Sequence, residues 1–228
     1  MIKVLLWDID GTILDFLAAE RVAIKKCFEI FGLGICTDEM VDNYSKINCR
    51  YWEMLERGEM TKPEILVGRF REFFGTIGVD ISVADSFNAE YQVRLGDTIC
   101  YKPKAREMVD YYKGKKIQCA VTNGTIIAQK KKLSASGLNQ VFDHIFISEE
   151  VGCEKPGKAF FDKVFEVIGE YNTSEVMIIG DSLTSDIRGG NNAGIITCWY
   201  NPGHLANNRN VKVVYEIDNL EKIKDILQ

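Results

Sequence analysis

The hydrophobic positions of this chain follow two different patterns, and the first consists of short, nearly continuous apolar runs. These runs occupy residues 2–7, 117–122, 144–148, 176–180 and 195–199. Apolar runs of this length are typical of strands that are buried on both faces of a parallel sheet. Helix-like stretches separate most of them, and this alternation predicts an α/β fold with a Rossmann-like parallel sheet core.

Residues 15–96 carry the second pattern, because their apolar positions recur at helical spacing. Examples are Val22, Ile24, Cys27, Phe28 and Phe31, followed by Met40, Val41, Tyr44 and Ile47. Glycine-containing turns at 32–34, 57–59 and 75–78 divide the stretch into about four helices. We therefore expect a helical cap domain at 15–96, inserted into an α/β core formed by residues 1–14 and 97–228.

The last part of the chain is less regular. A helix is expected to begin near residues 101–103 and to run to Tyr112. Residues 201–210 are rich in Asn, Gly and Pro and predict a loop. A short edge strand at 211–215 and a terminal helix are expected to follow.

Composition excludes several classes of function. The net charge is −5 and the lysines are mixed with acidic residues instead of forming one basic block, so nucleic acid is not an expected partner. Only two histidines occur and the seven cysteines are scattered, so the chain offers few ligands for a zinc site and few candidates for a histidine general base. The same cysteine pattern indicates reduced thiols and a cytoplasmic protein. No segment resembles a signal peptide or a membrane span, and no particular oligomeric state is indicated.

Four polar clusters follow predicted strands or lie between them: residues 8–12, 122–124, 154–156 and 180–186. Ligands of open α/β sheets gather beyond the carboxyl ends of the strands, so these clusters are expected to converge. Mg²⁺ prefers carboxylate and carbonyl oxygens. Asp8, Asp181 and the main-chain carbonyl of Asp10 form a candidate Mg²⁺ site.

Together the four clusters resemble the four motifs of the haloacid dehalogenase-like hydrolase superfamily, in its phosphatase branch with an N-proximal helical cap. The resemblance covers nearly the whole chain. It implies a Mg²⁺-dependent hydrolase of phosphate monoesters in which Asp8 is the nucleophile, forming an aspartyl-phosphate, and Asp10 is the general acid and base. One departure is that Gly157 and Lys158 follow Pro156, where the family often continues with Asp-Pro.

The resemblance also assigns supporting roles to the remaining motif residues. The hydroxyl of Thr122 and the main-chain N–H of Asn123 would bind phosphoryl oxygens, together with the charge of Lys155. Asp186 would orient Lys155 or a metal-bound water.

A narrower resemblance is to the YjjG-like pyrimidine 5′-nucleotidases. It rests on residues 14–16, 19–20, 47–48 with Trp52, 56–59, 69–70, 122–124, 180–187, 192–194 and 199–202. It implies that the substrate is a nucleoside 5′-monophosphate, most often a pyrimidine one and including those with non-standard bases. Asn48, Trp52 and Arg69 are the cap candidates for contacts with this substrate.

Several alternatives remain open at this stage. Within enzymes they are a phosphatase of a sugar phosphate or phosphoglycolate, a phosphomutase, and a dehalogenase. Outside enzymes they are a receiver-like phosphoacceptor and a silent binding protein. Helical spacing is also shared by Trp52, Phe70, Phe73 and Phe74, and it favours a structural role for them in the cap interior over contact with a base.

Overall fold

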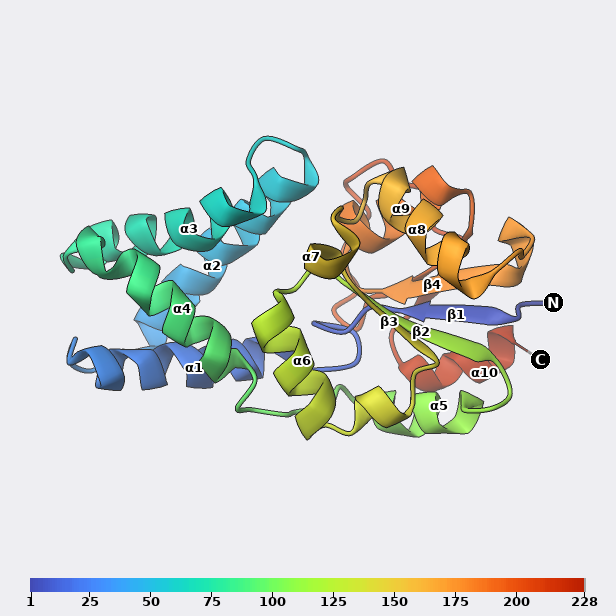
Figure 1. Cartoon of the computed structure of the whole chain (residues 1–228), viewed down its shortest axis with the longest axis horizontal. Helices are drawn as coiled ribbons and strands as arrows, with labels where there is room; N and C mark the ends of the chain where they lie inside the picture. The colour runs from blue at the N-terminus through green and yellow to red at the C-terminus, as the bar shows by residue number, and fades with distance from the viewer. Residues whose placement is uncertain (228) are drawn as a thin grey trace. The chain divides into compact units, whose positions relative to one another are not determined.

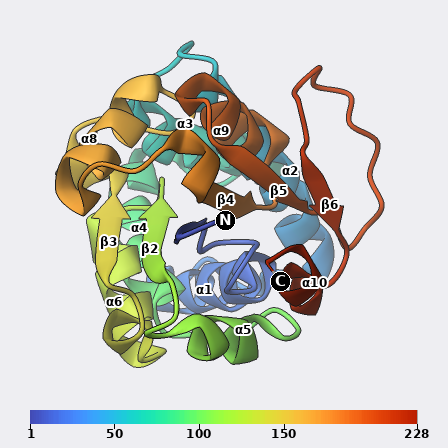
Figure 2. The ribbon, with the colours of Figure 1, turned by 90° about the vertical axis from the view of Figure 1, so that its right-hand side faces the viewer.

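The computed structural model describes residues 1–227 and contains a six-stranded parallel sheet. The strand order is β3-β2-β1-β4-β5-β6, which places the first strand of the chain near the middle of the sheet (Figure 2). The strands are β1 (Val4–Trp7), β2 (Ile117–Thr122), β3 (His144–Ile147), β4 (Val176–Gly180), β5 (Ile196–Tyr200) and β6 (Tyr215–Ile217). The parallel α/β sheet expected from the apolar runs is confirmed.

Strand register explains why the polar clusters meet. Trp7, the last residue of β1, pairs with Ala120 on one side and with Ile179 on the other. Because all the strands are parallel, the segments that leave β1, β2 and β4 emerge at the same edge of the sheet.

Helices cover both faces of this sheet (Figure 1). α8 (Lys158–Ile168) and α9 (Arg188–Ala193) lie on one face, where Phe160 and Phe161 join the apolar residues of β1, β2 and β4. α5 (Ala105–Tyr112) and α10 (Ile223–Ile226) lie on the other face. The short helix α7 (Ser148–Val151) follows β3 directly.

Two local predictions in this part of the chain are wrong. The edge strand is β6 at Tyr215–Ile217 instead of 211–215, because side chains bind the backbone that precedes it. Asn191 exchanges two hydrogen bonds of 2.8 Å with the backbone of Lys212, and the Thr197 hydroxyl accepts from Val214 N. The helix expected from 101–103 begins only at Ala105, since Lys104 adopts a left-handed conformation with φ of 65°.

The inserted stretch forms four α-helices: α1 (Phe16–Phe31), α2 (Asp38–Glu56), α3 (Lys62–Ile77) and α4 (Ala84–Leu95). Thr37 caps α2 through its hydroxyl, and Glu64 accepts a hydrogen bond from Thr61 N at the start of α3. An aromatic core joins these helices and includes Tyr44 stacked on Phe70, with ring centroids 4.9 Å apart.

The chain divides into two compact units. We call Phe16–Ile99 together with Ile127–Ala135 the helical unit, and the remainder the sheet unit. α6 (Ile126–Ala135) falls almost entirely in the helical unit, because Ala128 joins its apolar core and Lys131 Nζ donates to Val93 O at 3.1 Å. The expected boundaries of core and cap stay a prediction. Among residues 1–227 no helix combines the length and apolar character that crossing a bilayer requires.

Candidate active site

Asp8 follows β1 directly and is buried at the carboxyl edge of the sheet. Its main-chain N–H donates to Ile179 O at 2.9 Å, which continues the pairing with β4 by one residue. Its Oδ1 accepts a hydrogen bond of 2.8 Å from Lys155 Nζ. Its Oδ2 is also buried, and no hydrogen-bond partner for it exists among the described residues. A buried carboxylate oxygen without a donor is costly unless a ligand or ion completes the site.

Lys155 is 1% exposed, and its ammonium group makes three hydrogen bonds. It donates to Asp8 Oδ1 at 2.8 Å, to Asp186 Oδ1 at 2.7 Å and to Val121 O at 2.8 Å. An ammonium has three N–H donors, so these contacts use all of them. Burial lowers the pKa of Lys155, but the charges of Asp186 and Asp8 outweigh it and raise this pKa above its ordinary value.

Asn123 anchors the backbone of Lys155. Its Nδ2 donates to Lys155 O at 2.8 Å, and its Oδ1 accepts from Lys155 N at 2.9 Å. The side chain therefore ties the segment carrying the lysine to the end of β2. Sequence reasoning gave Asn123 a role only through its main-chain N–H, and that role stays a prediction.

Asp181 follows β4 and is held against the segment that leaves β1. Its Oδ1 accepts a hydrogen bond of 3.1 Å from the hydroxyl of Thr12, a residue for which no role was predicted. Gly11 adopts φ of 104°, and a Cβ there would lie 2.7 Å from Asp181 Cγ. Only glycine tolerates both this conformation and this close approach.

Asp186 lies in a π-helical turn at Leu183–Ile187 and is 1% exposed. Besides the contact with Lys155, its Oδ2 accepts from Ser182 N at 3.1 Å. A Cβ at Gly180 would lie 2.5 Å from Asp186 Cβ, so a side chain at that position would displace the carboxylate. Asp186 therefore has a fixed place beside Lys155, and its role of orienting Lys155 or a metal-bound water stays a prediction.

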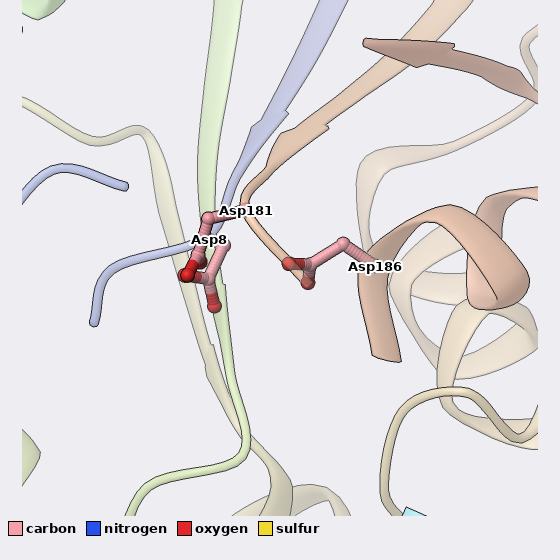
Figure 3. Close-up of side chains that lie close together, drawn as sticks. All are labelled: Asp8, Asp181 and Asp186. Atoms are coloured by element: carbon pink, nitrogen blue, oxygen red, sulfur yellow. The ribbon is translucent and has the colours of Figure 1, made fainter. Parts of the chain in front are cut away.

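Asp8, Asp181 and Asp186 form a cluster in which one oxygen of each lies within 4.8 Å of the others. Figure 3 shows the carboxyl groups of Asp8 and Asp181 side by side and that of Asp186 directed toward them. When all three carboxyl groups are ionised, their charge exceeds that of Lys155 by two, which a divalent cation would neutralise. The oxygen donors and the unpartnered Asp8 Oδ2 fit a hard cation such as Mg²⁺.

The pKa values reflect this crowding. Burial raises the pKa of Asp8 well above its ordinary value; Lys155 opposes this shift, whereas the charges of Asp186 and Asp181 add to it. Asp181 is exposed when the whole residue is considered, but its carboxyl group is desolvated. This desolvation and the negative charge of Asp186 raise the pKa of Asp181 to about 7. A bound cation would oppose both shifts, because its positive charge favours the charged form of each carboxyl group.

The remaining motif residues border the cluster. Asp10 is half-buried, and a backbone bridge joins it to Leu14. The hydroxyl of Thr122, the last residue of β2, accepts from Gly124 N at 3.1 Å and keeps a proton that it can donate. The structure thus brings the four predicted clusters to one edge of the sheet.

Two of the three predicted substrate residues lie in a buried polar network of the helical unit. Arg69 Nη1 donates to Asn48 Oδ1 at 2.6 Å, and Asn48 Nδ2 donates to Glu20 Oε2 at 2.8 Å. Arg69 Nη2 also donates to Asn88 Oδ1 at 3.2 Å. All but Asn88 are at most 3% exposed, so Asn48 links a buried cation to a buried anion. These contacts indicate a structural function for Asn48 and Arg69.

Trp52 differs from these two residues because it is half-buried. The guanidinium carbon of Arg69 lies 6.0 Å from the centroid of its ring. Sequence reasoning missed the network itself, although Glu20, a charged residue among the apolar positions of α1, was a possible signal.

Arg69→Met is expected to reduce the free energy of unfolding by about 3–5 kcal/mol near pH 8, because it leaves Glu20 buried without its cation. Burial raises the pKa of Glu20 and Arg69 opposes that shift, so the substitution raises this pKa further. A raised carboxyl pKa contributes stability at low pH that is lost as pH rises through it. The loss should therefore be smaller near pH 5, where Glu20 is protonated more easily.

Urea unfolding at both pH values measures this difference. Arg71→Met is the matched control, since Arg71 is exposed and pairs with exposed Asp85, a contact expected to contribute less than about 1 kcal/mol. A loss for Arg69→Met that matched the control, or that did not change with pH, would contradict the structural role of the network.

Residues 2–194 match the model of the haloacid dehalogenase-like hydrolase family. The pyrimidine 5′-nucleotidase PynA of Streptococcus pneumoniae is 36% identical over 227 residues, covering 99% of this chain and 94% of that protein. The pyrimidine 5′-nucleotidase YjjG of Escherichia coli is 27% identical, covering 97% and 96%.

A solved structure of the HAD-hydrolase YfnB from Bacillus subtilis is similar over the whole chain. Its TM-score is 0.94 at 36% identity, and the match covers 100% of this chain and 99% of that one. That crystal structure is described as bound to magnesium and as revealing interdomain movement.

Proposed function

Because this chain belongs to the haloacid dehalogenase-like hydrolase family, we propose that it hydrolyses phosphate monoesters through Asp8, and that its substrates are pyrimidine nucleoside 5′-monophosphates. The proposed catalytic role of Asp8 rests on the surroundings of its carboxylate. One carboxylate oxygen is fixed by Lys155, and the other is buried and without a partner among the described residues.

The proposed reaction has two steps. In the first, a carboxylate oxygen of Asp8 attacks phosphorus, the bond to the ester oxygen breaks, and the leaving alkoxide takes a proton from Asp10. In the second, Asp10 accepts a proton from a water molecule, whose oxygen attacks phosphorus and releases inorganic phosphate and the Asp8 carboxylate. A single carboxyl group serves as acid and then as base because the first step leaves it deprotonated.

Lys155 supports this reaction by position and charge. Since its three donors are already engaged, it holds Asp8 in one orientation and offsets part of the negative charge around the nucleophile. The Thr122 hydroxyl and the Asn123 main-chain N–H are the proposed donors to the phosphoryl oxygens.

The proposed cofactor is Mg²⁺, held by Asp8, Asp181 and the main-chain carbonyl of Asp10. When bound, it would reduce the repulsion between the carboxylate nucleophile and the phosphate dianion. Asp186 belongs to the same cluster, but its contacts with Lys155 and Ser182 N favour an orienting role over direct metal binding.

The proposed substrate class is supported by the names of two relatives, PynA and YjjG, both of which match nearly their full length. Trp52 is the proposed residue for stacking on the base, because it is a half-buried aromatic side chain of the helical unit. Arg69 and Asn48 would then act by supporting the helices around it.

A phosphate-release assay tests the proposal. The purified protein is incubated with Mg²⁺ and UMP, dUMP or dTMP, and in parallel with sugar phosphates and phosphoglycolate. We expect the pyrimidine nucleotides to be hydrolysed most efficiently, EDTA to abolish release, and excess Mg²⁺ to restore it. Efficient hydrolysis of a sugar phosphate with inert nucleotides would overturn the substrate class, and full activity in EDTA would overturn the metal requirement.

A further inference from the structure

Trp199 lies on β5 and contacts the backbone of Asp181. Its indole Nε1–H donates to Asp181 O at 2.9 Å, and the residue is 3% exposed. On the backbone, Trp199 pairs with Gly180, the last residue of β4. Trp199 therefore forms the last pair between β4 and β5, and its side chain binds the first main-chain carbonyl after the end of β4.

This contact fixes a peptide group that the sheet does not hold. Asp181 lies one residue past the end of the β4–β5 pairing, where a strand partner no longer sets the direction of its carbonyl. The indole supplies the missing donor. Among aromatic side chains of similar size, only tryptophan offers an N–H from a large apolar ring, because phenylalanine has no donor and the tyrosine hydroxyl extends from the ring tip.

Asp181 is thus held at two points. The hydroxyl of Thr12 binds its carboxylate at 3.1 Å, and the indole of Trp199 binds its main-chain carbonyl. Displacement of the carbonyl would move the adjacent Cα of Asp181, and with it the carboxylate that lies near that of Asp8. Residues that orient a metal ligand through hydrogen bonds commonly determine the affinity of the site.

We propose that Trp199 is a positioning residue that sets the Mg²⁺ affinity of the site by fixing the backbone of Asp181. This inference rests on the proposed metal site and deepens it. It predicts that loss of the indole N–H weakens metal binding even when the fold is intact. A purely structural role for Trp199 in β5 would instead affect stability alone.

The test is isothermal titration calorimetry of the whole protein with MgCl₂, comparing the unsubstituted chain with Trp199→Phe. We expect the Mg²⁺ dissociation constant to rise by about 10-fold to 100-fold. We also expect the Mg²⁺ concentration for half-maximal phosphate release to rise in parallel, while activity at saturating Mg²⁺ is largely restored.

Trp7→Phe is the matched control. Trp7 is also buried, and its indole Nε1–H donates to Gln118 Oε1 at 3.1 Å, on the side chain of a residue outside the acidic cluster. Both substitutions remove a buried indole hydrogen bond and should lower the melting temperature to a similar extent. Only Trp199→Phe is expected to change Mg²⁺ affinity.

A second variant covers the case in which Trp199→Phe does not fold. Replacement of Trp199 by β-(3-benzothienyl)alanine keeps the fused ring but lacks the N–H, and it should weaken Mg²⁺ binding in the same way. Unchanged Mg²⁺ affinity in a folded Trp199 variant would overturn this inference and leave the proposed function intact. No Mg²⁺ binding by the unsubstituted protein would overturn the metal site, and the inference with it.

Discussion

Asp8→Asn is expected to reduce phosphate release by on the order of 10⁴-fold or more while the protein stays folded. The amide is a much weaker nucleophile than the carboxylate and cannot supply the anionic oxygen that the proposed first step requires. The substitution also removes one negative charge from a cluster whose three carboxylates lie within 4.8 Å of one another. Relief of that repulsion should leave the melting temperature unchanged or raise it.

The measurement combines steady-state phosphate release with thermal unfolding of the same preparation. Asp162→Asn is the control, because Asp162 is an exposed carboxylate of α8 that pairs with Lys158, and its loss should leave activity unchanged. Activity of Asp8→Asn within about ten-fold of the unsubstituted protein would exclude Asp8 as the nucleophile.

Lys155→Met is expected to inactivate the protein and, unlike Asp8→Asn, to destabilise it by about 3–5 kcal/mol. The ammonium donates to Asp8, Asp186 and Val121 O, and methionine would leave these buried acceptors without a donor. Removing one partner of a buried charge cluster leaves the remaining charges uncompensated, which is the reason for the large expected loss.

Urea unfolding near pH 8 measures this loss, since the carboxyl groups are then driven toward their charged forms. Lys158→Met is the control: Lys158 lies three residues further along, is 63% exposed and pairs with Asp162, so its contribution should be below about 1 kcal/mol. Equal stability of the two variants would show that the three contacts of Lys155 do not hold the site together.

The convergence of the catalytic motifs could be predicted from the sequence because it follows from a simple geometric rule. Asp8, Thr122 and Asp181 each lie at or directly after the end of an apolar run, and the carboxyl ends of parallel strands lie at one edge of the sheet. Lys155 was identified by its resemblance to a family motif. The structure adds that its ammonium lies between Asp8 and Asp186.

Contacts between a side chain and a distant backbone could not be predicted in this way. Asn123 binds the backbone of Lys155 across 32 residues, and Trp199 binds that of Asp181 across 18. Neither contact produces a periodic signal in the sequence. The pattern therefore indicated only that Asn123 lies in a turn and that Trp199 lies in a buried strand. The edge strand was misplaced for the same reason, because Asn191 and Thr197 take hydrogen bonds that a strand would otherwise make.

The helical unit illustrates a second limit of prediction from the sequence. Helical spacing located its four helices, but spacing alone does not tell a buried arginine from an exposed one. Arg69 is 1% exposed, whereas Arg71 is 57% exposed in its side chain, although both belong to α3. The difference depends on the partners that α1, α2 and α4 bring to Arg69.

The central claim, that Asp8 accepts the phosphoryl group, is tested most directly by trapping the acyl phosphate. The protein is mixed with saturating substrate and Mg²⁺, quenched in acid, reduced with borohydride and analysed by peptide mass spectrometry. Borohydride reduces an aspartyl-phosphate to homoserine, so we predict substrate-dependent conversion of Asp8 to homoserine and no conversion of Asp10 or Asp181. Conversion at another aspartate, or a stable phosphate on Thr122 with Asp8 unmodified, would contradict the mechanism.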